Sequence, residues 1–141
     1  MRAIVALVLF LPAVAMACSA NEETVFRCVT TNGKPVHVCQ AKDTVNYRFG
    51  SKPDMEVKVP NAELKWEAGN GTGAFFNLLT FPHGKTLYQV LYIESFKGPP
   101  RRDGEVQVAR NGKQLADIQC ADGSVSFNSG ALKTHKPDSS Y

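Results

Sequence analysis

The sequence predicts an all-β protein, an antiparallel β-sandwich or small barrel of about eight or nine strands that follows an N-terminal signal peptide. Short runs in which apolar and polar residues alternate recur along the chain, as expected for strands with one buried face. Asn-Gly, Gly and Pro separate these runs, and no apolar helical stripe appears after the first 20 residues. These three observations are typical of antiparallel sheets.

Residues 1–20 have the layout of a secretory signal peptide. Arg2 supplies a positive start, residues 4–15 are an apolar run broken by Pro12, and Ala15 and Ala17 form the small-x-small pattern of a cleavage site. The apolar run is shorter than the roughly 20 residues that a membrane-spanning helix needs. We therefore expect a periplasmic or secreted protein with no membrane span.

Two cleavage points fit this pattern, and they differ in what happens to Cys18. Cleavage after Ala17 leaves Cys18 at the new N-terminus, whereas cleavage after Ala20 removes it. A further alternative is a bacterial lipoprotein signal, in which Cys18 carries a lipid anchor. Ala15 and Met16 do not match that signal, which usually has Leu and a small residue at these two positions. We take 1–20 as the signal, 21–130 as a single β-rich domain and 131–141 as a flexible C-terminal tail.

The first predicted hairpin is RCVTTNGKPVHVC, residues 27–39. Asn32-Gly33 is a strong turn signal between two strand-like runs, because both residues tolerate positive φ. A two-residue turn at Asn32-Gly33, or at Gly33-Lys34, puts Cys28 and Cys39 on one face of the hairpin. Cysteines of exported proteins tend to pair, so we expect a structural disulfide between Cys28 and Cys39.

Cys120 stays unassigned. It is a buried thiol, or it pairs with Cys18 where Cys18 survives cleavage, or it pairs with Cys28 or Cys39. Four cysteines allow three connectivities, and the sequence alone does not choose among them. No C-x2-C spacing occurs, so we expect neither a zinc site nor a redox dithiol.

The remaining strands follow in order and are separated by turns. The strand runs cover residues 43–50, 55–60, 62–66, 74–81, 85–96, 105–110 and 113–120, and residues 124–127 are a candidate for a short additional strand. The apolar runs at 74–81 and 85–96 are expected to form the central hairpin of the core. A second Asn-Gly, at 111–112, predicts another hairpin, in which a β-bulge near Ala116 is needed to turn Ile118 and Cys120 inward.

The charge of the chain argues against nucleic-acid binding. The full sequence has 16 basic and 13 acidic residues, and removal of Arg2 with the signal leaves a net charge of +2. Nucleic-acid binders usually carry a clustered basic face, and the one dense basic cluster lies in a loop. We expect no nucleic-acid partner.

No pattern of catalytic or metal-ligating residues is present in the sequence. The motifs G-x-S-x-G and H-E-x-x-H are absent, and the three histidines, His37, His83 and His135, are far apart. A catalytic reading needs a nucleophile with a base, paired carboxylates or a ligand set. We therefore expect a non-enzymatic protein with no cofactor and no metal, and keep an enzyme of unknown class as an alternative.

Binding is the function that we expect of such a domain, because small β-domains expose loops and edges to partners. The sharpest exposed candidate is the loop KGPPRRDG, residues 97–104. Its prolines stiffen it, and Arg101 and Arg102, with Lys97, are candidate residues for binding a carboxylate or phosphate. The expected partner is a protein or a cell-envelope component.

The stretches RCVTTNGKPVHVC, NYRFG and NGKQLADIQC resemble those of small uncharacterised periplasmic proteins of Gram-negative bacteria. That resemblance implies a β-rich exported domain and no particular activity. The chain is also similar in size, export and architecture to periplasmic lysozyme inhibitors. Ser129-Gly130 resembles the start of the S-G-x-x-Y loop of their c-type class, but Lys133 stands where that loop has Tyr. Lysozyme inhibition is therefore the alternative function.

Overall fold

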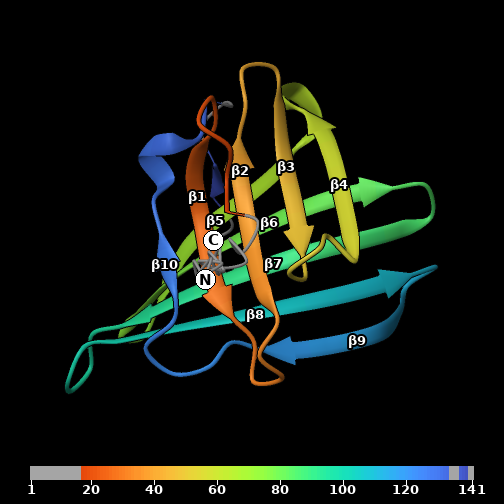
Figure 1. The fold of residues 1–141 in the computed structure, drawn as a ribbon. Coiled ribbons are helices and arrows are strands. Elements are labelled where there is room, and N and C mark those ends of the chain that lie inside the picture. The colour runs from red at the N-terminus through yellow and green to blue at the C-terminus, as the bar shows by residue number, and fades with distance from the viewer. Residues whose placement is uncertain (1–16, 134–136, 140–141) are drawn as a thin grey trace, which may run out of the picture.

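The computed structural model describes residues 17–133 and 137–139, and it confirms an all-β sandwich. Residues 1–16, which make up most of the predicted signal peptide, lie outside the described residues. Two sheets pack face to face, and the strands of one run steeply across those of the other (Figure 1). The described part of the chain holds eleven strands, two of them only two residues long.

The first sheet is an up-and-down arrangement that the C-terminal part of the chain completes. Its order is β10-β1-β2-β3-β4, with all neighbours antiparallel. The strands are β1 (Glu23–Val29), β2 (Pro35–Gln40), β3 (Thr44–Phe49), β4 (Met55–Pro60) and β10 (Ser126–Phe127).

The second sheet follows after a short 3-10 turn, η1 (Asn61–Glu63), and its order is β11-β5-β6-β7-β8-β9. Four antiparallel hairpin connections link β5 to β9, and the two-residue β11 adds in parallel to β5. The strands are β5 (Lys65–Gly71), β6 (Ala74–His83), β7 (Thr86–Ser95), β8 (Arg101–Arg110), β9 (Lys113–Gln119) and β11 (Asp138–Ser139).

The core lies between the inner faces of the two sheets. Alternate residues of each strand point into it, as the period of two requires. Tyr47 stacks on Tyr88 with ring centroids 5.6 Å apart and contacts Phe81 at 5.7 Å, which joins β3 to the second sheet. The largest side chains that are fully buried include Tyr47, Phe26, Phe81, Leu64 and Leu79.

Two disulfides are present, and neither is the expected Cys28–Cys39 bond, although one of them is an alternative left open for Cys120. Cys18 bonds to Cys39, and Cys28 bonds to Cys120. The expectation of a Cys28–Cys39 bond was wrong because the β1–β2 loop has three residues, 31–33, rather than two. Thr30 N–H donates to the Lys34 carbonyl, Gly33 takes φ +80°, and Cys28 therefore faces Val36.

An odd loop length moves every residue of β2 to the opposite face relative to β1. Cys28 belongs to the core, while Cys39 lies on the outer face of the first sheet, where Arg48 Nη1 is 3.4 Å from its sulfur. Cys120, just after β9, instead approaches β1 through a bridge to Thr30. The Cys28–Cys120 bond thus connects the two sheets.

The second Asn-Gly hairpin forms as predicted. Asn111 and Gly112 take φ of 51° and 74° in a two-residue turn between β8 and β9. The register shifts next to Ala116, which faces Val108, so Ile118 packs against the core while Leu115 is exposed.

The described part of the segment 131–141, expected to be a flexible tail, contacts the domain. A second 3-10 turn, η2 (Ser129–Ala131), ends in the buried Ala131, and Leu132 packs against the core. The backbone N–H of Lys133 donates to the side chain of Gln40 at 3.1 Å. The domain therefore extends beyond residue 130.

Candidate binding groove

The three central strands of the second sheet, β6, β7 and β8, are longer than the strands of the first, which leaves part of their inner face uncovered. Strands β6, β7 and β8 have ten residues each, whereas β2, β3 and β4 have six. At the uncovered end, the segment of residues 122–129 runs along the inner face, and two cavities of about 570 and 490 Å³ lie between them. Both cavities include Glu94, and we call the combined hollow the overhang groove.

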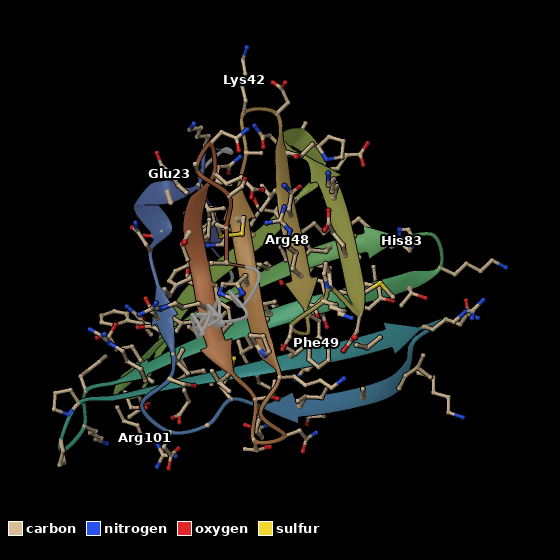
Figure 2. All side chains as sticks on the ribbon, viewed as in Figure 1. Glu23, Lys42, Arg48, Phe49, His83 and Arg101 are labelled. Carbon is tan, nitrogen blue, oxygen red and sulfur yellow. A yellow bond between two sulfur atoms is a disulfide. The ribbon has the colours of Figure 1, made fainter. Side chains whose placement is uncertain are left out.

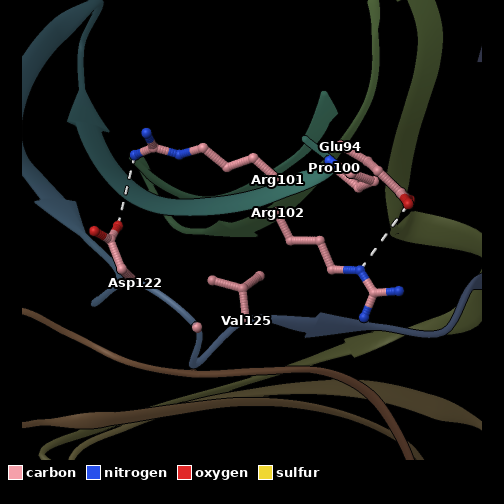
Figure 3. A pocket seen from close by; sticks show the side chains of 7 residues that line it. Glu94, Pro100, Arg101, Arg102, Asp122 and Val125 are labelled. Atoms are coloured by element: carbon pink, nitrogen blue, oxygen red, sulfur yellow. Dashed lines mark ion pairs between the residues drawn. The ribbon is translucent and has the colours of Figure 1, made fainter. Parts of the chain in front are cut away.

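One end of the overhang groove is charged (Figure 3). Glu94 and Arg102 are directly opposed on β7 and β8, and Arg102 Nε lies 4.0 Å from Glu94 Oε1. Arg101 Nη2 lies 3.6 Å from Asp122 across the cavity, and its Nε donates to Asp103 at 2.9 Å. All these ion pairs are largely exposed, and such pairs contribute little to stability.

The two arginines extend in different directions, because successive side chains of a strand point to opposite faces. Figure 3 shows the Arg101 guanidinium against Asp122 and that of Arg102 against Glu94. Arg101 also pairs with Asp103. Lys97 lines neither of the two cavities. Its aliphatic stem packs over Gly73, where an added Cβ would lie 2.9 Å from Lys97 Cδ. Of the three predicted residues, Arg101 and Arg102 thus line the charged cavity and Lys97 does not.

The other end of the overhang groove is aromatic. Tyr92 stacks on Phe127 with centroids 4.9 Å apart, which joins β7 to β10 at the floor. Phe75 lines the cavity and meets Phe96 at 4.9 Å, and these two rings are 48% and 51% exposed. Exposed phenylalanine rings that touch each other beside a cavity are typical of contact sites for other molecules.

Tyr92 connects the aromatic and charged ends. Its hydroxyl donates to Glu94 Oε2 at 3.0 Å. Burial, followed by the hydrogen bond to Glu94 and its negative charge, raises the pKa of Tyr92 to about 12. The tyrosine therefore stays a neutral donor at ordinary pH, and it holds Glu94 at the centre of the groove.

Sequence reasoning found Arg101 and Arg102 but missed the acidic and aromatic residues of the groove. Glu94 becomes a site residue only through its pairing with Arg102, and that register is not visible in the sequence. Phe75 and Tyr92 sit in strands, where core packing is the usual explanation of aromatic residues. The sequence predicts a short strand for Phe127, but its contact with Tyr92 depends on the return of the chain to β1.

The other titratable clusters do not form a comparable site. His37 lies between Arg27 and Arg48 on the outer face of the first sheet, and burial and both arginines lower its pKa. His83 lies at the opposite end of the second sheet from Arg101 (Figure 2), and His135 is outside the described residues. Within residues 17–133 and 137–139, no three His, Cys, Asp or Glu side chains gather to hold a metal ion.

Glu105 and Asp117 lie near each other on the outer face of the second sheet. Burial, followed by the hydrogen bond to Asp117, raises the pKa of Glu105. Gln107 and Gln119, which lie alongside, lower the pKa of Glu105 through hydrogen bonds.

No described helix is long and apolar enough to cross a membrane. Comparison of the chain with family models, with curated proteins and with solved structures found no match. The geometry of the groove is therefore the basis for a proposed function.

Proposed function

We propose that this chain is an exported, non-enzymatic β-domain that binds a protein or cell-envelope component through the overhang groove. Two disulfides and the signal-like residues 1–20 support export to an oxidising compartment. Of the two partner classes, the groove favours an extended segment of a protein, because it combines apolar rings with separate charges over two cavities that share Glu94.

The observation that carries the proposal is the exposed Phe75–Phe96 ring pair beside the Glu94–Arg102 ion pair. Covering two half-exposed rings removes apolar area from water, at roughly 25 cal/mol per Å². Arg102 and Glu94 are 62% and 41% exposed and 4.0 Å apart, so an acidic group of a partner can replace Glu94 next to Arg102 at small cost. We therefore expect a partner segment with an apolar side chain near a carboxylate.

Site-specific photocrosslinking in living cells tests this proposal. A benzophenone amino acid replaces Phe75 in one variant and Leu115 in a matched control. Both positions are exposed apolar residues, at 48% and 56%, but Leu115 lies on β9 and outside the groove. We expect a discrete covalent adduct in the periplasmic fraction from position 75 and none from position 115. Equal labelling from both positions would remove the groove from the proposal.

Lysozyme inhibition is the second candidate, and one observation favours it. Ser129, the first residue of the sequence Ser129-Gly130, lines the aromatic end of the groove. Asn128 caps η2 by accepting from Gly130 N–H at 3.1 Å, which holds this turn beside the cavity. A lysozyme assay with the purified protein decides the matter: if c-, g- and i-type lysozymes all stay fully active, the candidate is excluded.

A further inference from the structure

The segment that precedes β1 is built into the domain from Cys18 onward. Cys18 is disulfide-bonded to Cys39, a fully buried residue of β2 on the outer face of the first sheet. Ser19 N–H and its hydroxyl both donate to Glu22 Oε1, at 2.8 and 2.7 Å. Ala17, by contrast, is exposed and precedes the first of these contacts.

Glu22 anchors this segment to the sheet. Arg48 donates to both of its carboxylate oxygens, at 2.8 and 3.1 Å, and Asn46 donates at 2.7 Å. The Glu22 side chain is only 4% exposed. Residues 18–22 therefore cover the outer face of β2 and β3, and Cys39, Asn46 and Arg48 are shielded beneath them.

Cleavage at the two candidate points would have opposite effects on this arrangement. Hydrolysis after Ala20 removes Cys18 and Ser19, which leaves Cys39 as a free thiol and takes two donors from Glu22. Hydrolysis after Ala17 keeps every contact. The small-x-small pattern of Ala15 and Ala17 ends at that same bond.

We infer that the chain is processed at the Ala17–Cys18 bond and that the sulfur of Cys18 is then used for the Cys39 disulfide rather than for a lipid anchor. Water adds across the Ala17–Cys18 amide, giving a carboxylate on Ala17 and an amine on Cys18. The two thiols then lose two protons and two electrons to a disulfide oxidant, whose own disulfide is reduced to two thiols. A thioether to lipid would use the same sulfur, so the two fates exclude each other.

This inference rests on the export that we proposed above, and intact mass of the purified protein tests both. The full chain is expressed with its own N-terminus in a Gram-negative host, and thiols are alkylated before analysis. We expect a chain of residues 18–141 with two disulfides and no alkylated cysteine, and a Cys18 peptide linked to a Cys39 peptide. A chain that begins at Asn21 with alkylated Cys39, or a Cys18 that carries lipid mass, overturns the inference.

A Cys18→Ser variant separates the two processing routes. Cleavage that is guided by Ala15 and Ala17 does not need the thiol, so we expect processing after Ala17 to continue and Cys39 to become available to alkylation. Loss of processing in this variant would show that lipid attachment to Cys18 comes first, and would overturn the inference. An unprocessed wild-type chain in the cytoplasm would instead overturn the proposed export together with it.

Discussion

Glu22 and Arg48 form a bidentate ion pair on the outer face of the first sheet, and their side chains are only 4% and 12% exposed. Arg48 also donates to Glu56 at 3.3 Å, so one guanidinium joins the segment before β1 to β3 and β4. Burial by itself raises the pKa of Glu22, but hydrogen bonds from Arg48, Ser19 and Asn46 outweigh it and lower that pKa to about 2.

The first prediction is that this pair makes stability depend on acid pH. The pKa of Glu22 is lower in the folded state than its ordinary value of 4.5, so its contribution is complete above about 4.5 and is lost as pH falls toward 2. A shift of this size corresponds to about 3 kcal/mol. In Glu22→Gln we expect the free energy of unfolding at pH 7 to be lower by about 2–3 kcal/mol. We also expect this free energy to change less with pH between 4.5 and 2 than it does in the original chain.

Urea unfolding at a series of pH values measures this effect. Glu23→Gln is the matched control, because it makes the same change one residue along, at an exposed position. If Glu22→Gln and Glu23→Gln shift the unfolding free energy equally at every pH, the buried pair does not stabilise the fold.

The second prediction concerns the unequal contribution of the two disulfides. Cys28 and Cys120 are 92 residues apart, whereas Cys18 and Cys39 are 21 apart. Loop-closure entropy gives about 4.6 kcal/mol for the longer loop and about 3.3 kcal/mol for the shorter. We expect the Cys28→Ser, Cys120→Ser double variant to lose more unfolding free energy than the Cys18→Ser, Cys39→Ser variant. Denaturant unfolding of both under non-reducing conditions compares them, and the reverse order would contradict the argument.

These disulfides also show which features of the fold could be predicted from the sequence and which could not. Alternation and turn residues predicted most of the strands, and Asn111-Gly112 formed the expected two-residue turn. Two placements were wrong: the strand expected at 62–66 is η1 followed by β5 (Lys65–Gly71), and the loop expected at 97–104 ends where β8 begins, at Arg101. The same dipeptide at 32–33 lies in a three-residue loop, in which Gly33 alone takes positive φ. Asn-Gly occurs in both two-residue and three-residue loops. One additional residue in the loop moves Cys39 to the opposite face of the hairpin from Cys28. The pairing of Cys28 with Cys120 then depends on contact between the two sheets. No local sequence pattern predicts which residues meet there.

The groove was less predictable than the fold for a related reason. Arg102 is conspicuous in the sequence, but its opposition to Glu94 comes from the register of β7 and β8. The exposure of Phe75 results from the first sheet being shorter than the second, a property of two sheets together. Strand periodicity describes one strand at a time, so it assigned these residues to the core or to a loop.

The third prediction is that Gly104 is required by the contact between the sheets. A Cβ at this position would lie 2.7 Å from Cys120 Sγ and 3.1 Å from Phe26 Cζ. Neither neighbour can move freely, since one is in a disulfide and the other is fully buried. We expect Gly104→Ala to lower the unfolding free energy by about 1–3 kcal/mol. Gly71→Ala is the control, because nothing lies within 4 Å of its Cβ position; equal thermal midpoints for both variants would disprove the close contact.

The fourth prediction separates binding from folding at the overhang groove. Arg102 is 62% exposed and its ion pair with Glu94 spans 4.0 Å, so Arg102→Glu should change the unfolding free energy by less than about 1 kcal/mol. The reversed charge would, however, repel a partner carboxylate, and we expect a loss of about tenfold or more in affinity. In the crosslinking experiment, the adduct from position 75 should weaken accordingly.

Arg110→Glu provides the matched control for this change, because Arg110 is an exposed arginine at the other end of β8. It alters the net charge of the protein by the same amount without touching the groove. If both variants weaken the adduct equally, the effect comes from long-range attraction between net charges, which salt screens over about 10 Å. Loss in Arg102→Glu alone, persisting in 0.5 M salt, would place the carboxylate of the partner beside Arg102, because only a close contact survives such screening.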